Sequence, residues 1–191
     1  MVAERAEAVE RVVLVGFMAA GKTSVGRRLA EVLGWGFVDF DDIIEARTGA
    51  SIPEIFRTQG EAAFRAMEAR LTDEFGQARG VVLAPGGGWV TQPDLMDRLG
   101  DGSLVVWLRI SPEEAVRRAL ADSVHRPLLA GPEPLARARL LLAEREPFYY
   151  LADSAVDVDG RGIEEIAREI VARVRLLHDS KPAPAWPDDS E

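Results

Sequence analysis

Residues 16–23 read Gly-Phe-Met-Ala-Ala-Gly-Lys-Thr, and this segment constrains the fold more than any other part of the chain. It matches the pattern G-x-x-x-x-G-K-[ST], in which backbone N–H groups of a glycine-rich loop face phosphate oxygens. Lys22 then reaches the outer phosphates and the Thr23 hydroxyl binds Mg²⁺. An apolar run, Arg11–Val15, precedes the loop, and a helical pattern over 22–33 follows it. We therefore expect a strand, a phosphate loop and a helix whose positive end faces the anion, rather than an ordinary glycine-rich turn.

Short apolar runs alternate with helical patterns along most of the chain. The expected strands are Arg11–Val15, Gly36–Phe40, Val81–Ala84, Leu104–Leu108 and Ser154–Val158. The first and fourth runs lack polar alternation, as strands buried on both faces do. Strands that alternate with helices indicate a parallel sheet with right-handed crossovers. The predicted fold is α/β, with three layers (α/β/α) around a central five-stranded parallel sheet.

The two ends of the chain differ from its middle. Residues 1–10 are polar and read as a flexible segment, whereas 180–191 carry three prolines and three acids from Lys181 onward and read as a disordered tail. Between them we find no linker and no repeat, so 11–179 is expected to be one domain.

Composition excludes several classes of function. With no cysteine, the chain has no disulfide, zinc–thiolate site or thiol nucleophile. The net charge of −9 argues against nucleic acid as a partner. No apolar run approaches the ~20 residues of a membrane span, and no signal peptide begins the chain, so we expect a cytoplasmic protein without membrane contact.

Two acids follow the second expected strand. Asp39 and Asp41 stand two residues apart, and in an extended segment such residues face the same way. One carboxylate can then hold the hydration shell of Mg²⁺ while the other accepts a hydroxyl proton. The alternative is a strand-end acid that caps a helix with further acids in its first turn.

A possible anion-binding arginine lies in the next helical pattern. Arg65 has Glu61 four residues before it and Glu68 three residues after it, so both can brace its guanidinium. A braced arginine binds a carboxylate or phosphate through two hydrogen bonds. A solvated ion-pair helix has the same pattern, and the residues alone do not decide between the two.

Three further features fall at chain turns. Gly86, Gly87 and Gly88 follow the third expected strand and offer bare backbone N–H groups. Arg126 lies in a Gly- and Pro-containing segment between two helices, and Arg145 lies near a helix end. Either arginine can be a surface residue, or one of them can close over a nucleotide on a mobile loop.

A phosphate loop alone does not separate kinases from nucleotide switches. Guanine-specific switches read the base with an Asn-Lys-x-Asp segment, and this chain contains no asparagine. Its 191 residues also disfavour the large mechanochemical ATPases.

Taken together, the motifs and their spacing resemble the shikimate kinase family over about 12–172. The stretch 40–56, Phe-Asp-Asp-Ile-Ile-Glu-Ala-Arg-Thr-Gly-Ala-Ser-Ile-Pro-Glu-Ile-Phe, is similar to that family's pattern D-x-x-I-E-x-x-x-G-x-S-I-x-E-I-F. The resemblance implies a P-loop kinase with a substrate-binding region at about 40–70 and a mobile lid at about 118–131. It also implies transfer of the ATP γ-phosphoryl group to the 3-hydroxyl of shikimate, with Mg²⁺ as cofactor.

The resemblance also implies a role for each candidate residue. Lys22, Asp41 and Arg126 would be catalytic. ATP would contact Gly16, Ala19, Ala20, Gly21, Lys22, Thr23, Ser24, Arg118 and Arg126. Shikimate would contact Asp41, Phe56, Phe64, Arg65, Gly86, Gly87, Gly88 and Arg145. Thr23 and Asp39 would bind the metal.

Some alternatives stay open at this stage. The acceptor could be gluconate or a nucleoside monophosphate, and the chain could instead be a nucleotide-binding regulatory module without turnover. Arg117 competes with Arg118 for the place beside adenine. Ala19 stands where the family often has glycine, which stiffens the loop. We expect a monomer that binds ATP and shikimate.

Overall fold

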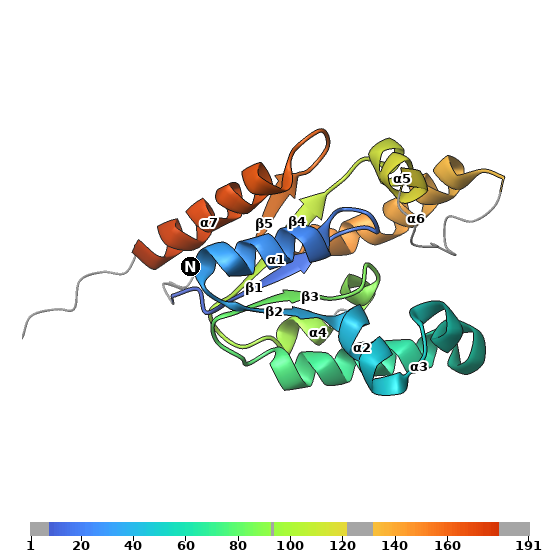
Figure 1. Ribbon diagram of the computed structural model, residues 1–191, viewed down its shortest axis with the longest axis horizontal. Helices are drawn as coiled ribbons and strands as arrows, with labels where there is room; N and C mark the ends of the chain where they lie inside the picture. Colours follow the sequence, from blue (N-terminus) through green and yellow to red (C-terminus); the bar gives the residue numbers. More distant parts are fainter. Residues whose placement is uncertain (1–7, 93, 122–131, 180–191) are drawn as a thin grey trace, which may run out of the picture.

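The computed structural model describes residues 8–92, 94–121 and 132–179, and at its centre lies a five-stranded parallel sheet (Figure 1). The strands are β1 (Arg11–Val15), β2 (Gly36–Asp39), β3 (Val81–Ala84), β4 (Ser103–Arg109) and β5 (Ser154–Asp157). They lie in the order β2-β3-β1-β4-β5, and every neighbouring pair is parallel. The predicted sheet is confirmed.

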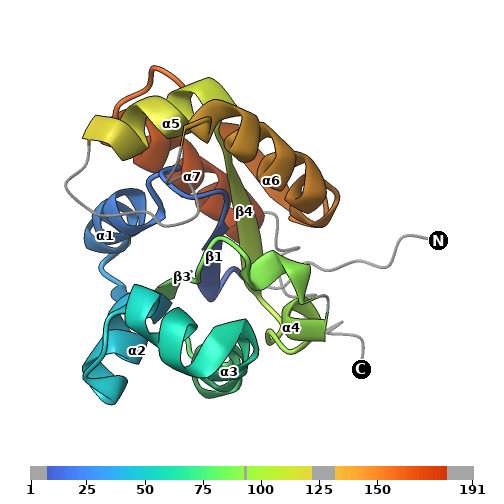
Figure 2. The same ribbon diagram turned by 90° about the vertical axis from the view of Figure 1, so that its right-hand side faces the viewer.

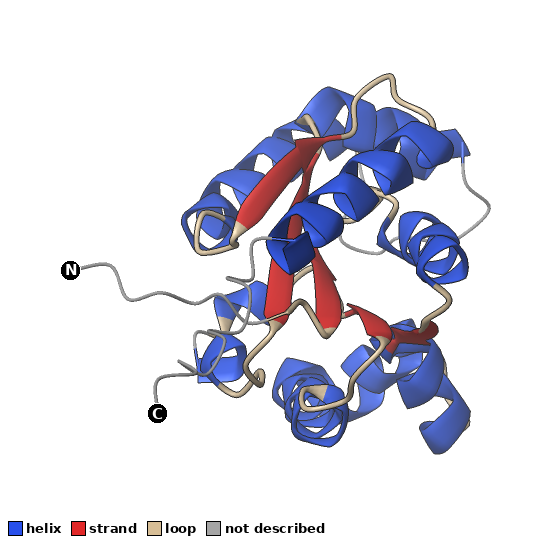
Figure 3. Ribbon diagram, turned by 90° about the vertical axis from the view of Figure 1, so that its left-hand side faces the viewer, coloured by secondary structure: helices blue, strands red, loops and turns tan. Residues whose placement is uncertain are grey.

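Helices connect the strands and cover both faces of the sheet (Figure 3). They are α1 (Lys22–Leu33), α2 (Phe40–Thr48), α3 (Ile52–Phe75), α4 (Asp94–Asp97), α5 (Pro112–Ala121), α6 (Pro134–Tyr149) and α7 (Ile163–Asp179), with a 3-10 turn η1 at Trp89–Thr91.

The two faces of the sheet bury two separate cores, as the alternation of side chains along a strand requires. On β1, Val12 and Leu14 join the core that contains α1 and α7 residues. Val13 and Val15 of the same strand join the core that contains α2 and α3 residues. All five β1 residues are buried, which confirms a strand covered on both faces. The expected three-layer architecture follows.

Some element boundaries differ from the sequence prediction. The second strand ends at Asp39 rather than Phe40, because the Asp39 carboxylate accepts a hydrogen bond from the Asp41 backbone N–H at 3.0 Å and starts α2. The last strand ends at Asp157, one residue before the predicted Val158. Residues 8–10, which the sequence placed in a flexible segment, pack on the fold, where Val9 is buried.

Helix α3 is interrupted at Gly60, whose φ of 80° and ψ of 170° lie outside the helical region. This backbone conformation is accessible to glycine and strongly disfavoured for other residues. The part of α3 that follows Gly60 buries Phe64 and Leu71 against the sheet, as its periodicity predicts. The break places Phe56 and Phe64, one from each part, in contact across it.

The carboxyl ends of β1, β2 and β3 meet at one edge of the sheet, where parallel sheets bind ligands. Seen from this edge, the loop after β3 lies between the pair α5 and α6 and the pair α2 and α3 (Figure 2). Among the helices of the described segments, none combines the length and the apolar character that crossing a membrane requires.

Candidate active site

The loop after β1 leads directly into the N-terminus of α1. A Cβ atom on Gly16 would lie 2.7 Å from the carbonyl oxygen of Leu108, so only glycine fits this position. Gly21 caps α1 with a left-handed φ of 92°. Ala20 is buried, and its N–H donates to the carbonyl of Phe17 at 3.2 Å. These contacts fix a loop that opens onto the positive end of a helix, where a phosphate is stabilised.

Two other predicted loop residues lie at the same place. Ala19 adopts a left-handed φ of 62°, the only positive φ of a residue other than glycine in the described segments. For an L-residue this conformation costs about 1 kcal/mol, and the glycine common in the related family would avoid that cost. Ser24 lies exposed in the first turn of α1.

The Lys22 ammonium group folds back over the loop. Its Nζ donates to the carbonyl oxygens of Gly16 at 2.9 Å and Phe17 at 3.4 Å. The side chain thus holds a positive charge above the turn in which the backbone N–H groups would bind phosphate.

Thr23 and Asp39, the predicted metal ligands, lie in direct contact. The Thr23 hydroxyl donates to Asp39 Oδ2 at 2.7 Å, across from α1 to the end of β2. Both residues offer oxygen atoms, the ligands that Mg²⁺ prefers, and Mg²⁺ at nucleotide sites takes its other ligands from phosphates and water. No cluster of three or more metal-binding side chains occurs in the described segments. The pair therefore fits an ion that is bound mainly through a nucleotide.

Asp41 reaches the site by a different route from the one that the sequence suggested. The segment from Asp39 to Asp41 is not extended, because Asp39 is the N-cap of α2 and Asp41 lies in its first turn. The argument from an extended strand was wrong, and the alternative of a cap followed by first-turn acids describes the backbone correctly. The cap hydrogen bond still holds the two acids side by side.

The Asp41 carboxyl group is poorly solvated. No hydrogen-bond donor in the described segments reaches its buried Oδ1. Burial, followed by the charge of Asp39, raises the pKa of Asp41 from 3.8 to about 6, although the nearby Lys22 ammonium acts in the opposite direction. A carboxylate with a free oxygen and a raised pKa is suited to accept a proton from a bound hydroxyl.

Arg65 is held by the two acids that flank it on α3. Its Nη1 lies 2.5 Å from Glu68 Oε2, and its Nη2 lies 2.8 Å from Glu61 Oε1. The two partners are not equivalent, because Glu68 is fully buried and Glu61 is 63% exposed. Burial raises the pKa of Glu68 from 4.5 to about 7 against the opposing effect of Arg65. Arg65, with a side chain that is 16% exposed, is therefore a fixed and largely buried arginine rather than part of a solvated ion-pair helix.

The three glycines after β3 each approach a different part of the site. A Cβ on Gly86 would lie 2.5 Å from Glu68 Oε1, and a Cβ on Gly88 would collide with the Arg65 guanidinium. Gly87 faces the phosphate loop, since its Cβ would lie 3.3 Å from the Gly16 carbonyl oxygen. The backbone of this turn therefore joins the phosphate loop to the arginine site without intervening side chains.

Arg145 approaches the same turn from α6. Its Nη1 would lie 3.7 Å from a Cβ on Gly87, and its guanidinium carbon lies 6.0 Å from the Phe17 ring centroid. We call Arg65, Arg145 and the three glycines the anion clamp. It brings two guanidinium groups and a bare backbone together next to the phosphate loop, as the sequence predicted.

Phe56 and Phe64 lie beside the clamp. Their ring centroids are 4.9 Å apart with planes tilted by 40°. Phe64 is buried and lies 5.4 Å from the Arg65 guanidinium carbon. The two rings thus form an apolar surface next to Arg65.

The structure distinguishes Arg118 from Arg117. Arg118 crosses from α5 to the phosphate loop, where its Nη1 lies 3.5 Å from the Ala19 carbonyl, and its Nη2 donates to the Val158 carbonyl at 2.6 Å. Arg117 is 67% exposed and pairs with Glu114 instead. Only Arg118 therefore lies at the nucleotide side of the loop. Arg126 and most of the predicted lid, 122–131, lie outside the described residues.

Sequence reasoning missed three residues that shape this site. It treated Glu68 as equivalent to Glu61, and it gave no role to Glu114 or to Tyr149. Glu114 accepts from Arg118 Nε at 2.7 Å, and Tyr149 donates from its hydroxyl to the Gly87 carbonyl at 2.7 Å. The spacing of three or four residues to an arginine was a usable signal for Glu114, whereas the Tyr149 contact joins residues 62 positions apart.

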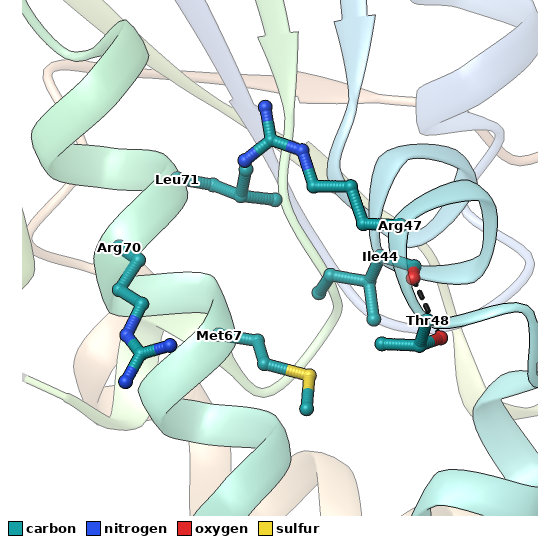
Figure 4. Close-up of a pocket in the computed structure, with 6 residues that line it drawn as sticks. All are labelled: Ile44, Arg47, Thr48, Met67, Arg70 and Leu71. Atoms are coloured by element: carbon teal, nitrogen blue, oxygen red, sulfur yellow. Dashed lines mark hydrogen bonds between the residues drawn. The ribbon is translucent and has the colours of Figure 1, made fainter.

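A separate cavity of about 190 Å³ lies between α2 and α3 (Figure 4). Ile44, Met67 and Leu71 give it an apolar wall, and Arg47, Thr48 and Arg70 complete its lining. Arg47 already forms a double hydrogen bond with Glu74. None of the predicted site residues lines this cavity, so it is distinct from the site described above.

The fold and the phosphate loop define a P-loop nucleotide-binding protein, and the family match given next makes it a P-loop kinase, an ATP-dependent phosphotransferase. Residues 18–175 match the family model described as shikimate kinase. The chain belongs to the shikimate kinase family.

Relatives and solved structures agree with this assignment. The shikimate kinase of Parasynechococcus marenigrum is 49% identical over 146 residues, which cover 76% of each chain. That of Halorhodospira halophila is 49% identical over 84% of this chain and 91% of its own. The structure of the shikimate kinase from Acinetobacter baumannii in complex with shikimate superposes with a TM-score of 0.82 at 38% identity, covering 92% of this chain and 97% of the other. A gluconokinase from Sinorhizobium meliloti, at 20% identity and a TM-score of 0.60, shares the fold alone.

Proposed function

We propose that this protein transfers the γ-phosphoryl group of ATP to the 3-hydroxyl of shikimate. One observation carries the proposal: the glycines of the anion clamp lie so close to the phosphate loop on one side and to Arg65 on the other that a Cβ atom would touch either. An acceptor whose carboxylate binds the clamp is thereby held against the phosphate chain of the nucleotide. Because positioning supplies much of the catalysis in phosphoryl transfer, this proximity is the main requirement of the reaction.

The proposed chemistry is a direct displacement at phosphorus. The acceptor oxygen forms a bond to the γ-phosphorus, the bond from that phosphorus to the bridging oxygen breaks, and ADP leaves with the electron pair. Asp41 orients the hydroxyl and accepts its proton at the carboxylate. Lys22 and Arg126 are proposed to neutralise the phosphoryl oxygens as charge moves to the leaving group.

Mg²⁺ bound with ATP would be held by Thr23 and Asp39 and would neutralise phosphate charge. Their hydroxyl–carboxylate contact at 2.7 Å supports this assignment, because it places two oxygen ligands at the start of α1.

The remaining assignments describe binding. Arg65, Arg145 and the backbone of Gly86–Gly88 are proposed to hold the carboxylate of shikimate, and Phe56 and Phe64 to cover its ring. The guanidinium of Arg118 is proposed to lie against adenine, and the lid to close over the nucleotide and exclude water. The loop residues 16, 19–21 and 24 are proposed to contact the phosphates.

We further propose a monomer that acts in the cytoplasm. Support for the monomer comes from the site itself, because one chain supplies the phosphate loop, Asp41 and the anion clamp. Support for the location comes from the absence of cysteine and of a long apolar run in the sequence.

Coupled ADP release with shikimate, gluconate and AMP offered separately tests the proposal. We expect turnover with shikimate that exceeds turnover with the other two acceptors by at least about 100-fold. All three acceptors carry an anion that the clamp can bind, so the discrimination is expected from the fit of the carboxylated ring against Phe56, Phe64 and Asp41. Preference for gluconate or AMP would overturn the proposed acceptor, and absence of turnover with all three would favour a regulatory module.

A further inference from the structure

The three glycines of the anion clamp form a turn whose central peptide has two sterically allowed orientations. The N–H of Trp89 donates to the Gly86 carbonyl at 3.0 Å and closes a four-residue turn, which we call the glycine turn. Gly88, its third residue, has φ of −100° and ψ of 1°. These are the values of a type I turn.

A glycine at the third position usually favours the other common turn. In a type II turn the third residue has a φ of about +80°, which glycine adopts without steric cost. The two types differ by a rotation of the central peptide, here Gly87–Gly88, which reverses the directions of the Gly87 carbonyl and the Gly88 N–H. With glycine on both sides of that peptide, local sterics leave both orientations open.

Tyr149 holds the observed orientation. Its hydroxyl donates to the Gly87 carbonyl oxygen at 2.7 Å. Because the peptide is trans, the Gly88 N–H must point away from Tyr149. The opposite orientation would turn the carbonyl away from this donor and leave the buried hydroxyl proton without this acceptor, at a cost, although the hydroxyl oxygen would keep its hydrogen bond with Arg145.

The tyrosine is itself fixed. Its side chain is fully buried at the last residue of α6, and its ring stacks on Trp107 of β4 with centroids 5.5 Å apart and planes inclined by 14°. Burial raises the pKa of Tyr149 above its ordinary value, against the opposing effect of the Arg145 charge. The hydroxyl therefore keeps its proton and remains a donor over the physiological range.

We propose that Tyr149 is a positioning residue that locks the glycine turn with the Gly88 N–H facing the acceptor's carboxylate. The inference rests on the proposed function, since it assigns that N–H to the binding of an acceptor. Tyr149 touches neither the acceptor nor the nucleotide in this account. Its hydroxyl contacts both the Gly87 carbonyl and the Arg145 side chain, and the inference concerns the first of these contacts.

Steady-state kinetics of Tyr149→Phe test the inference, with Tyr150→Phe as the matched control. Tyr150 is the next residue, is 66% exposed and also contacts Trp107. The control substitution therefore removes a tyrosine hydroxyl close to the same tryptophan. We expect Tyr149→Phe to raise the KM for shikimate about fivefold or more, the equivalent of one hydrogen bond. The KM for ATP and kcat should stay within about twofold, and Tyr150→Phe should behave as the wild type.

Other kinetic outcomes count against the inference. An unchanged KM for shikimate in Tyr149→Phe would overturn it. Equal increases in the KM values of both substrates would point to a general loss of structure, and would also overturn it. If the wild type itself does not use shikimate, the proposed function fails first, and the turn must then be tested without an acceptor.

Nuclear magnetic resonance on the unliganded protein supplies that independent test. Rotation of the central peptide brings the Gly87 α-protons close to the Gly88 amide proton, so their cross-relaxation distinguishes the two turn types. We expect a weak Gly87–Gly88 cross-peak in the wild type and in Tyr150→Phe, and a strong one in Tyr149→Phe. A strong cross-peak in the wild type, or a weak one in Tyr149→Phe, would contradict the role of Tyr149 whichever acceptor the enzyme uses.

Discussion

Replacing Glu68 by glutamine should separate the stability of this protein from its activity. Glu68 is fully buried beside Arg65, and its pKa is about 7 in the folded protein against an ordinary value of 4.5. A raised pKa means that the folded state holds the proton while the unfolded state releases it. The unfolding free energy is therefore highest below pH about 4.5 and falls as the pH rises towards 7.

The size of this effect follows from the pKa shift. At roughly 1.4 kcal/mol per pKa unit, the shift from 4.5 to about 7 corresponds to about 3.5 kcal/mol in total, of which about 2.5 kcal/mol of unfolding free energy is lost between pH 5 and 8. The Glu68→Gln variant carries no ionisable group at this position and should lack that decrease. Its unfolding free energy should therefore exceed that of the wild type at pH 8 and approach it at pH 5.

Urea unfolding followed by circular dichroism at pH 5, 6, 7 and 8 measures the difference directly. Glu61→Gln is the matched control, because Glu61 binds the same Arg65 but is 63% exposed, and it should follow the wild type. If wild type and Glu68→Gln lose stability in parallel over this range, the buried carboxylate does not carry the effect and the reasoning is wrong. The variant should also show about a tenfold higher KM for shikimate, because Arg65 loses its buried charged partner.

Three further predictions concern the reacting groups. Because Asp41 accepts a proton only when it is ionised, the wild-type kcat/KM should fall below pH about 6 in a pH-controlled coupled assay. In the same assay, Asp41→Asn should lower kcat by about 100-fold or more. A wild-type rate that does not depend on pH would exclude Asp41 as the base. Arg118→Ala should raise the KM for ATP about tenfold, whereas Arg117→Ala should not, and equal effects would refute the distinction between them. Thr23→Val should raise the Mg²⁺ concentration needed for half-maximal ADP release, while an unchanged magnesium titration would remove Thr23 from the metal site.

The sheet and the phosphate loop could be predicted because local sequence determines them. Runs of valine and leucine mark strands that are buried on both faces, and the loop pattern fixes what precedes and follows it. The approximate position of the anion clamp followed from topology, since residues after parallel strands meet at one edge.

The error at Asp39 has a local physical cause. The apolar Phe40 looked like the end of a strand, but a side-chain cap from Asp39 starts the helix one residue earlier. Asp39 and Asp41 still lie together, but the helix cap brings them together and the alternation of side chains along a strand does not. An aspartate at the end of an apolar run can either continue the strand or cap a helix, and the sequence pattern permits both.

Which of two similar residues belongs to the site depends on distant parts of the chain. Arg117 and Arg118 lie three and four residues after Glu114, so both spacings allow an ion pair. Only the packing of α5 against the phosphate loop selects Arg118. In the same way, Glu61 and Glu68 both lie within one helical turn of Arg65, but only Glu68 is buried, at a place where Gly86 of another segment comes close to its carboxylate.

The central claim is that the anion clamp binds the carboxylate of the acceptor. It is tested most directly by comparing kcat/KM for shikimate and for its methyl ester in the wild type and in Arg65→Ala. The wild type should prefer the free acid by about 100-fold, and Arg65→Ala should lose most of that preference by weakening only the reaction of the acid. An equal preference in both proteins, or a wild type that uses acid and ester alike, would contradict the account.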